Sequence, residues 1–419
     1  MLSEVKRYYF LVSFLAFACF PMMPNAAQSI VFGLFLFCSL LYKFDFRKLN
    51  KSLIVFVVLT ILLLILTICR SEDKIELKGK LLQLIPFILG VIITFLSPKL
   101  ITKKELDIVK NIFLLSLVIY MFLYINYFIK GYEIYNKTVI LHIEPVKTFF
   151  FDKLFAIILD KNIYSCAIYG QEMILNNYDF FYHYFYLNIL FLIGIFFCIE
   201  YVLSTKKLRF KTYYFILLIV LILFMSTLPS KSKILLLGLL IFYGVSLYFK
   251  VSRQIKYFIG IILAILTLII GLKYKSYFLN IELVRYTIYK VCHCNLSLSD
   301  YIFGIGIGDI KSFINMSLHK VIVMKNHSNE LVYFNTHNQY LEFLLSFGVF
   351  GLIAILYSCY KWMKITSRIN SIPGNTFLVC IILVLFCFEN VLNRSWGVYS
   401  ILFLINIQYF TSFLEAKDE

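Results

Sequence analysis

Twelve apolar stretches recur along this chain, and most are long enough to cross the hydrocarbon core of a bilayer as an α-helix. Of the 419 residues, 61% are hydrophobic and only 15% are charged. A soluble protein of this length does not need so much apolar surface. The sequence therefore predicts an all-α polytopic membrane protein, with residues 1–419 forming a single transmembrane domain. The predicted spans lie near residues 8–23, 28–44, 52–69, 82–98, 111–129, 182–203, 211–228, 233–249, 256–273, 338–360, 376–393 and 396–413.

The first stretch is short and contains Pro21, with Pro24 just beyond it. Because Lys6 and Arg7 precede the apolar run, it has the features of a cleaved signal peptide as well as those of a membrane helix. The eleven further spans favour an uncleaved first helix. A total of eleven spans, without this helix, stays open as an alternative.

Basic residues in short loops predict the orientation, because cytoplasmic loops of membrane proteins carry an excess of Lys and Arg. With both termini in the cytoplasm, five basic clusters fall on the cytoplasmic side. They are Lys43/Arg47/Lys48/Lys51, Lys99/Lys103/Lys104/Lys110, Lys206/Lys207/Arg209/Lys211, Lys250/Arg253/Lys256 and Lys361/Lys364/Arg368. Contact of these loops with anionic lipid explains the net charge of +17, and no basic tract is long enough to indicate a nucleic acid partner.

Two long segments then face outward, residues 130–181 and 274–337. Both contain amphipathic stretches, such as residues 146–161, with Phe and Leu on one side and Lys and Asp on the other. This pattern is typical of helices that lie in the membrane interface or cover a cavity.

The predicted topology places four polar features on the outer side. They are the pair His337-Asn338 at the head of span 338–360, Lys233 at the head of span 233–249, Arg285 in the second long segment, and Arg394 between the last two spans. Each has a structural explanation, because a basic side chain at a helix end reaches the headgroups and Asn caps helices. Polar groups where a chain re-enters lipid are nevertheless costly, so they are the best candidates for function.

Cations around one imidazole suit chemistry on a phosphorylated lipid. Arg and Lys can hold a pyrophosphate and offset its charge as a leaving group. A His can accept the proton of an attacking hydroxyl. No Asp/Glu cluster on the outer side has the pattern of a Mg²⁺ site, so we expect neither a metal nor another cofactor.

Two further motifs are ambiguous. The triplet Cys292-His293-Cys294 lacks the two-residue spacer of zinc knuckles, which argues against a metal site. The stretch FGIGIGD at 303–309 lacks the strand and helix of a dinucleotide site. A flexible turn is the preferred interpretation for it, and phosphate contact is the alternative.

The pattern of His337-Asn338, nine residues, Gly348, two residues and Gly351 resembles the signature of the O-antigen ligase and polymerase superfamily, and agrees with the ligase form throughout. Upstream, Arg285 with Tyr289 resembles the family's Arg three or four residues before an aromatic residue. The stretch at 303–308 resembles the Gly-rich segment that follows it.

Two sites match less well. The stretch from His183 to Tyr186 is similar to the family's His-Pro-x-Tyr but lacks the Pro. Ser232-Lys233 stands where the family usually has Ser or Thr followed by Arg, and Lys loses the bidentate geometry of Arg toward phosphate. The resemblance covers roughly residues 180–415.

By this resemblance the chain is a GT-C-like glycosyltransferase of the bacterial inner membrane, with its active site facing the periplasm. The donor implied is a glycan on undecaprenyl pyrophosphate. A ligase passes the glycan to a sugar hydroxyl of lipid A–core, whereas a polymerase passes it to another lipid-linked repeat unit. The resemblance implies inversion at the anomeric carbon, with His337 activating the acceptor, Arg285 and Lys233 holding the pyrophosphate, and Asn338 and His183 lining the cavity.

Tyr186 and Arg394 are further candidate binding residues.

The ligase is preferred over the polymerase because the His-Asn signature has the ligase form. A flippase or transporter of lipid-linked glycan is a third alternative, but the central apolar stretches lack the midplane ionisable groups such proteins need.

Overall fold

The computed structural model of the chain describes residues 2–41, 51–96, 101–139, 184–227, 283–319, 336, 338–369, 383, 386, 390–393 and 395–418. Within these residues every regular element is a helix, which confirms a helical fold. The chain divides into two compact units. Unit 1 comprises Met1–Phe46, Ile93–Leu240 and Ser395–Glu419, and unit 2 comprises Arg47–Ile92 and Ile241–Arg394.

Unit 1 is built around a cluster of buried phenylalanines. Its helices are α1 (Leu2–Ala18), the 3-10 turn η1 (Phe20–Met22), α2 (Asn25–Leu40), α5 (Lys103–Val139), α8 (Tyr184–Ser204), α9 (Leu208–Thr227) and α18 (Ser395–Asp418). The rings of Phe113 and Phe403 stack with centroids 4.8 Å apart, and those of Phe14 and Phe35 with centroids 5.1 Å apart. Large aromatic side chains dominate the energetics of such cores. The N-terminal segment is therefore an integral part of the packing of unit 1, and its Pro21 lies in the turn η1 between two helices.

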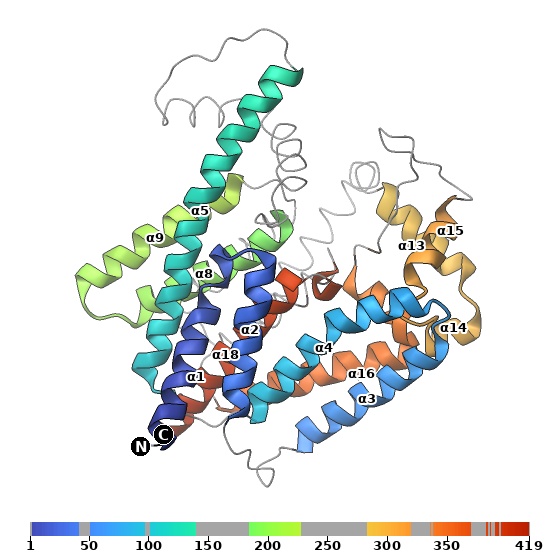
Figure 1. Cartoon of the computed structure of the whole chain (residues 1–419), viewed down its shortest axis with the longest axis horizontal. Coiled ribbons are helices and arrows are strands. Elements are labelled where there is room, and N and C mark those ends of the chain that lie inside the picture. Colours follow the sequence, from blue (N-terminus) through green and yellow to red (C-terminus); the bar gives the residue numbers. More distant parts are fainter. Residues whose placement is uncertain are drawn as a thin grey trace, which may run out of the picture. The chain divides into compact units, whose positions relative to one another are not determined.

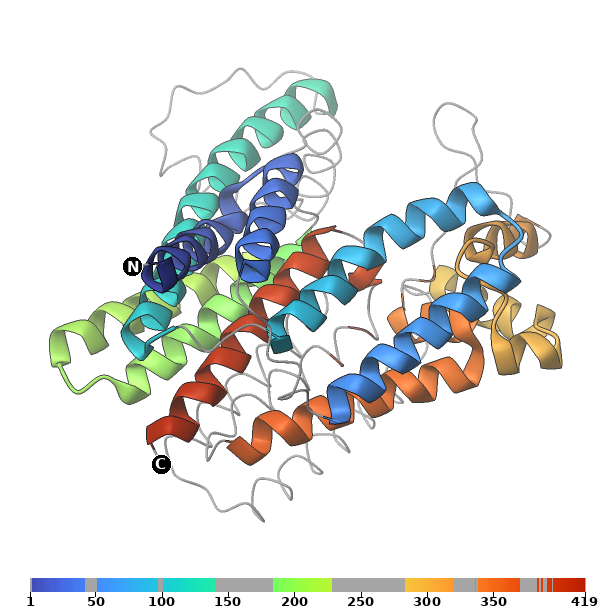
Figure 2. The ribbon, with the colours of Figure 1, turned by 60° about the horizontal axis from the view of Figure 1, so that its bottom comes forward.

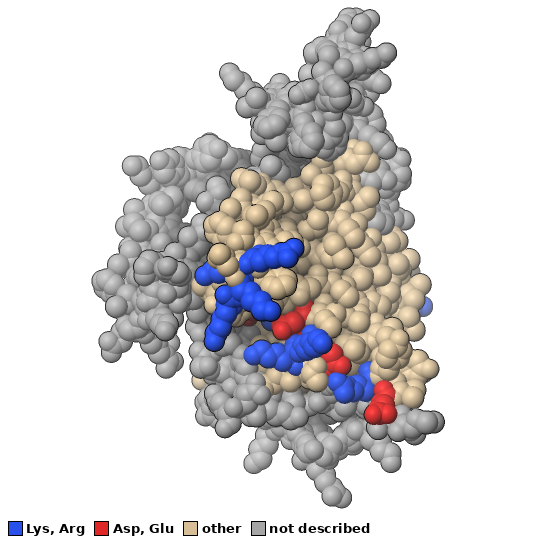
Figure 3. Space-filling view, turned by 90° about the vertical axis from the view of Figure 1, so that its left-hand side faces the viewer, with Lys and Arg blue, Asp and Glu red and all other residues tan. Residues whose placement is uncertain are grey.

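Basic residues gather at one end of unit 1. Arg7 of α1 forms an ion pair of 2.7 Å with Glu105 of α5, and Lys110 of α5 forms one of 2.9 Å with Glu200 of α8. Figure 3 shows Lys and Arg side chains gathered in one area of the face it views. The exposed basic residues near these pairs in the sequence are Lys103, Lys104, Lys206, Lys207, Arg209 and Lys211. Two of the clusters predicted to be cytoplasmic thus meet at the same end of unit 1.

Unit 2 contains α3 (Lys51–Arg70), most of α4 (Lys74–Leu96), α13 (Leu283–Asn295), α14 (Leu298–Phe303), α15 (Ile310–His319), α16 (Gln339–Ile369) and the 3-10 turn η3 (Val391–Asn393). Figures 1 and 2 show α13, α14 and α15 at the end where α3 turns into α4. Arg70, the last residue of α3, joins them through an ion pair of 2.6 Å with Asp300 and a hydrogen bond of 2.9 Å to the Gly304 carbonyl. The helices of the predicted second outer segment therefore pack on the predicted outer end of α3 and α4.

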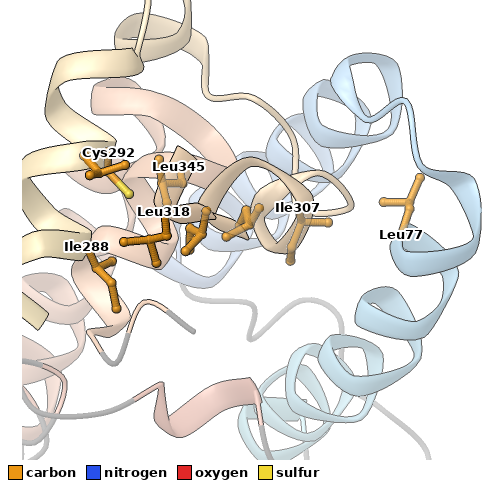
Figure 4. Packing of buried hydrophobic residues seen from close by; sticks show 9 residues of the cluster. Leu77, Ile288, Cys292, Ile307, Leu318 and Leu345 are labelled. Atoms are coloured by element: carbon orange, nitrogen blue, oxygen red, sulfur yellow. The ribbon is translucent and has the colours of Figure 1, made fainter. Parts of the chain in front are cut away.

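An apolar core holds these short helices in place. Leu77 of α4, Ile288 of α13, Ile307, Leu318 of α15 and Leu345 of α16 are all at most 5% exposed and belong to one buried cluster (Figure 4). Burial of such side chains contributes about 1.5–3 kcal/mol each. The start of α16 is thereby fixed against α13.

Among the described residues, five helices are long and apolar enough to cross a membrane, and they match five predicted spans. The helical segments are Lys74–Thr94, Lys103–Asn126, Tyr186–Ser204, Leu208–Met225 and Gln339–Ser358. Shorter apolar helices, Ala26–Leu40, Val57–Arg70 and Gly397–Thr411, overlap three further predicted spans. The predicted spans 233–249, 256–273 and 376–393 lie wholly or mostly outside the described residues. The chain is a helical membrane protein, and the total of twelve spans stays a prediction.

The first long segment begins differently from the prediction, whereas the second contains an amphipathic helix as predicted. Helix α5 has 37 residues and is about 55 Å long, so it exceeds the 30 Å hydrocarbon core and continues through residues 130–139 of the first segment. The rest of that segment, including residues 146–161, lies outside the described residues. In the second segment, α15 is amphipathic, with Ile310 and Ile314 buried and Met316 exposed.

Candidate functional site

The start of α16 is tied to α13 by Asn338. The side-chain Oδ1 of Asn338 accepts a hydrogen bond of 3.0 Å from the Leu341 N–H, and its backbone carbonyl accepts one of 3.0 Å from the Glu342 N–H. Asn338 therefore caps the helix, which satisfies otherwise unpaired donors of the first turn. Its Nδ2 also donates to the Tyr289 hydroxyl at 3.4 Å. The structural explanation for Asn338 holds, and the same side chain links α16 to the helix that carries Arg285.

Asn390 binds the same region from a distant part of the chain. Its Oδ1 accepts hydrogen bonds from the Thr336 hydroxyl, at 2.7 Å, and from the Asn338 backbone N–H, at 2.8 Å. Two residues further on, the Leu392 N–H donates to Oε1 of Gln339 at 2.9 Å. The segment before Arg394 is thus bound to the first turn of α16.

Glu342 is a buried acidic residue that contacts Thr336 and Asn390. The residue is 3% exposed and lies one turn into α16. Its carboxylate lies 2.9 Å from the Thr336 hydroxyl, which shares its one proton between this carboxylate and Oδ1 of Asn390. The carboxylate also accepts from Nδ2 of Asn390 at 3.4 Å and lies 3.5 Å from Nζ of Lys80 on α4. A buried carboxylate is tolerated only with such partners, because removal of one leaves an uncompensated charge. These contacts define a polar cluster of Lys80, Thr336, Asn338, Glu342 and Asn390.

The predicted site residues divide into three groups. His337, Lys233, His183 and Arg394 lie outside the described residues. Arg285 lies on α13, one turn before Tyr289, and the structure describes its backbone but not its side chain. Tyr186 is 4% exposed in unit 1, on α8.

Three sequence positions next to predicted site residues do converge within unit 2. Tyr289 follows Arg285 on α13, Asn338 follows His337, and the segment 390–392 ends two residues before Arg394. Hydrogen bonds join all three. These contacts bring together described residues that lie one to four positions from Arg285, His337 and Arg394 in the sequence, and a site shared by those three residues stays a prediction.

No sequence pattern singles out Lys80, Thr336, Glu342 or Asn390 as site residues. A weaker signal was present for Glu342, because it is an acidic residue five positions after His337 inside a predicted membrane span. Lys80 directly precedes another span. The partners themselves depend on tertiary contacts, since Asn390 and Lys80 are 48 and 262 positions away from Glu342.

Gly348 of the signature breaks α16. Its φ of 69° and ψ of −172° interrupt the helix, and a Cβ at this position would lie 2.1 Å from the Ile302 carbonyl oxygen. Close to this kink the Leu345 carbonyl accepts a hydrogen bond of 2.8 Å from the Ile305 N–H. Gly348 is thus required where α14 and the Gly-rich turn approach the α16 backbone.

The Gly-rich turn at 303–309 is bonded to its surroundings. The Ile307 N–H donates to Oγ1 of Thr67 at 2.7 Å, and the Gly308 N–H donates to Oγ of Ser71 at 3.1 Å. These donors, like that of Ile305, are therefore occupied by protein acceptors. The geometry supports a turn, as preferred, but one packed on α3 and α16, and it leaves these three N–H groups unable to bind phosphate.

The triplet on α13 does not form a shared site. Cys292 is 1% exposed, whereas Cys294 is exposed, since residues two positions apart on a helix point in different directions. Burial, together with the nearby Glu342 carboxylate, raises the pKa of the Cys292 thiol to about 12. The His293 ring instead contacts the Tyr301 hydroxyl. Cys292 therefore acts as a small core residue.

Comparison with models of protein families and with curated proteins finds no match to this chain.

Proposed function

We propose that this chain is a membrane glycosyltransferase that moves a glycan from undecaprenyl pyrophosphate to a sugar hydroxyl of lipid A–core. The reaction would take place at the periplasmic face of the bacterial inner membrane. The single observation that carries the proposal is the hydrogen bonding of Asn338 to both Tyr289 and Asn390. These three residues lie within four positions of the candidate residues His337, Arg285 and Arg394, respectively. The resemblance of the His-Asn signature to the ligase form supports the choice of reaction.

In the proposed mechanism, the His337 imidazole accepts the proton of the acceptor hydroxyl as the oxygen attacks the anomeric carbon. The bond between this carbon and the pyrophosphate oxygen breaks, and undecaprenyl pyrophosphate leaves. Arg285 and Lys233 offset the charge that develops on the leaving group.

A polymerase that joins lipid-linked repeat units is the second candidate, and Lys233 in place of the ligase Arg favours it mildly. Deletion of the gene separates the two, with lipopolysaccharide examined on a gel. Core without repeat units, together with lipid-linked polymer, would support the ligase. Core carrying a single repeat unit would support the polymerase, and an unchanged ladder would contradict both. If the chain were a flippase, deletion of its gene would instead leave the lipid-linked glycan on the cytoplasmic side of the membrane.

We expect Arg285→Ala to use the lipid donor at least about tenfold less efficiently, because a cation that pairs with pyrophosphate is lost. The measurement is kcat/KM for the donor with purified protein in lipid discs. Lys290→Ala is the matched control, since Lys290 is an exposed cation on the same helix. Equal effects of the two variants would contradict a specific role for Arg285.

We expect Lys233→Arg to retain transfer within about threefold, because the charge is kept and the family usually has Arg here. Lys233→Met, which removes the charge at similar volume, should lose most activity in the same assay. Complete loss in Lys233→Arg would show that this side chain is not a simple cation.

A further inference from the structure

A single atom, Oδ1 of Asn390, contacts both Thr336 and Asn338, the residues directly before and after His337. This oxygen lies 2.7 Å from the Thr336 hydroxyl and 2.8 Å from the Asn338 backbone nitrogen. Because a backbone N–H can only donate, the oxygen of the amide has to face Asn338. The side chain of Thr336 and the backbone of Asn338, one position to each side of His337, thus contact the same acceptor oxygen.

The attachment of Thr336 and Asn338 to Asn390 is shielded from water and has its own support. Thr336 is 0% and Asn390 4% exposed, so solvent does not compete for these hydrogen bonds. The amide Nδ2 of Asn390 donates to the Glu342 carboxylate, which is paired with Lys80. The orientation of the Asn390 amide is therefore determined from both sides.

We propose that Asn390 and Thr336 are positioning residues that hold the backbone at His337 so that its imidazole meets the acceptor hydroxyl. The benefit to the reaction rests on the proposed function. The proposal that Asn390 orients His337 through residues 336 and 338 does not depend on which reaction the protein catalyses. Displacement of a reacting group by about 1 Å can cost about a hundredfold in rate, so the attachment would act on kcat rather than on donor binding.

The first test compares Thr336→Val, which keeps the side-chain shape but removes the hydroxyl, with Thr336→Ser, which restores it. Thr94→Val is the matched control, because Thr94 is also buried and its hydroxyl lies 3.1 Å from Oδ1 of Asn406 in unit 1. We expect kcat of Thr336→Val to fall about ten- to a hundredfold with KM for the donor unchanged, Thr336→Ser to recover most of it, and Thr94→Val to match the wild type. An unchanged kcat in Thr336→Val, or an equal loss in Thr94→Val, would overturn the proposal.

Asn390→Asp offers a second readout that does not require Thr336→Val to fold. A protonated Asp can still donate to Glu342, whereas an ionised one faces it with like charge. We expect kcat of this variant to decline relative to wild type as the pH rises and the new carboxyl group ionises. A pH profile parallel to that of the wild type would count against a positioning role.

Carbethoxylation of His337 by diethyl pyrocarbonate, measured by mass spectrometry, separates this proposal from the proposed function. We expect the labelling rate of His337 to change in Thr336→Val and to stay the same in Thr94→Val. If labelling changes in Thr336→Val but the wild type transfers no glycan, the positioning role of Thr336 and Asn390 would be supported and the proposed glycosyltransferase function would be refuted. Identical labelling in all three proteins would refute the attachment even if transfer is found.

Discussion

Glycan transfer by His337→Ala is expected to fall by about a hundred- to ten-thousandfold, the usual contribution of a general base. The loss should appear in kcat, because the imidazole interacts with a proton that moves only as the acceptor attacks. The wild-type rate should rise with pH as the imidazole loses its own proton, and the variant should lack this rise.

The measurement is transfer of glycan from the lipid-linked donor by purified protein in lipid discs, across a range of pH. His293→Ala is the matched control, since His293 is an exposed histidine on α13 whose ring contacts Tyr301. Wild-type transfer by a stably expressed His337→Ala protein would remove the catalytic role of His337. Equal losses in both variants would indicate damage to the fold of unit 2 instead.

The Gly348→Ala variant is expected to destabilise unit 2 by at least about 3 kcal/mol. A side chain at φ of 69° is strained, and its Cβ would lie 2.1 Å from the carbonyl oxygen of Ile302. Neither atom can move without displacing backbone, because the Ile305 N–H is hydrogen-bonded to the Leu345 carbonyl beside the kink. The expected result is a lower temperature of unfolding and a lower yield of folded protein.

Gly79→Ala is the matched control for this variant. Gly79 lies within α4 of the same unit, and an added Cβ there meets no atom within 4 Å. Alanine favours a helix over glycine by about 0.5–1 kcal/mol, so this variant should be as stable as the wild type or slightly more so. Thermal unfolding of both variants in the same detergent tests the pair. A Gly348→Ala protein as stable as Gly79→Ala would contradict the steric role of Gly348.

The membrane helices could be predicted because the length and hydropathy of a segment are local properties. Span 111–129 corresponds to the core of α5, and span 338–360 to the first part of α16. The helix ends were less predictable. Residues of α5 beyond the bilayer thickness carry no apolar signal, so its continuation to Val139 was missed. The kink at Gly348 was also missed, because it depends on the contact with α14.

Part of the candidate site could also be predicted. The position of Asn338 at the head of an apolar helix made a cap the structural alternative to a functional role, since capping needs only the first turn of that helix. The pattern in the sequence also directed attention to Arg285 and His337. It gave no indication that Asn390 contacts both Thr336 and Glu342, because those contacts require two segments 48 to 54 positions apart to fold together.

The sequence by itself determined that this chain forms helices in a membrane, which of their ends carry basic clusters, and which residues deserve a chemical test. These properties follow from the cost of placing polar or charged groups in lipid, which each segment meets independently of the others. Only the tertiary structure decided the partners: Lys80 with Glu342, Asn390 with both neighbours of His337, and the Gly-rich turn with α3 and α16. A buried polar group has to find its hydrogen bonds among whichever side chains the packed helices bring within about 3 Å, and that selection is made by the fold as a whole.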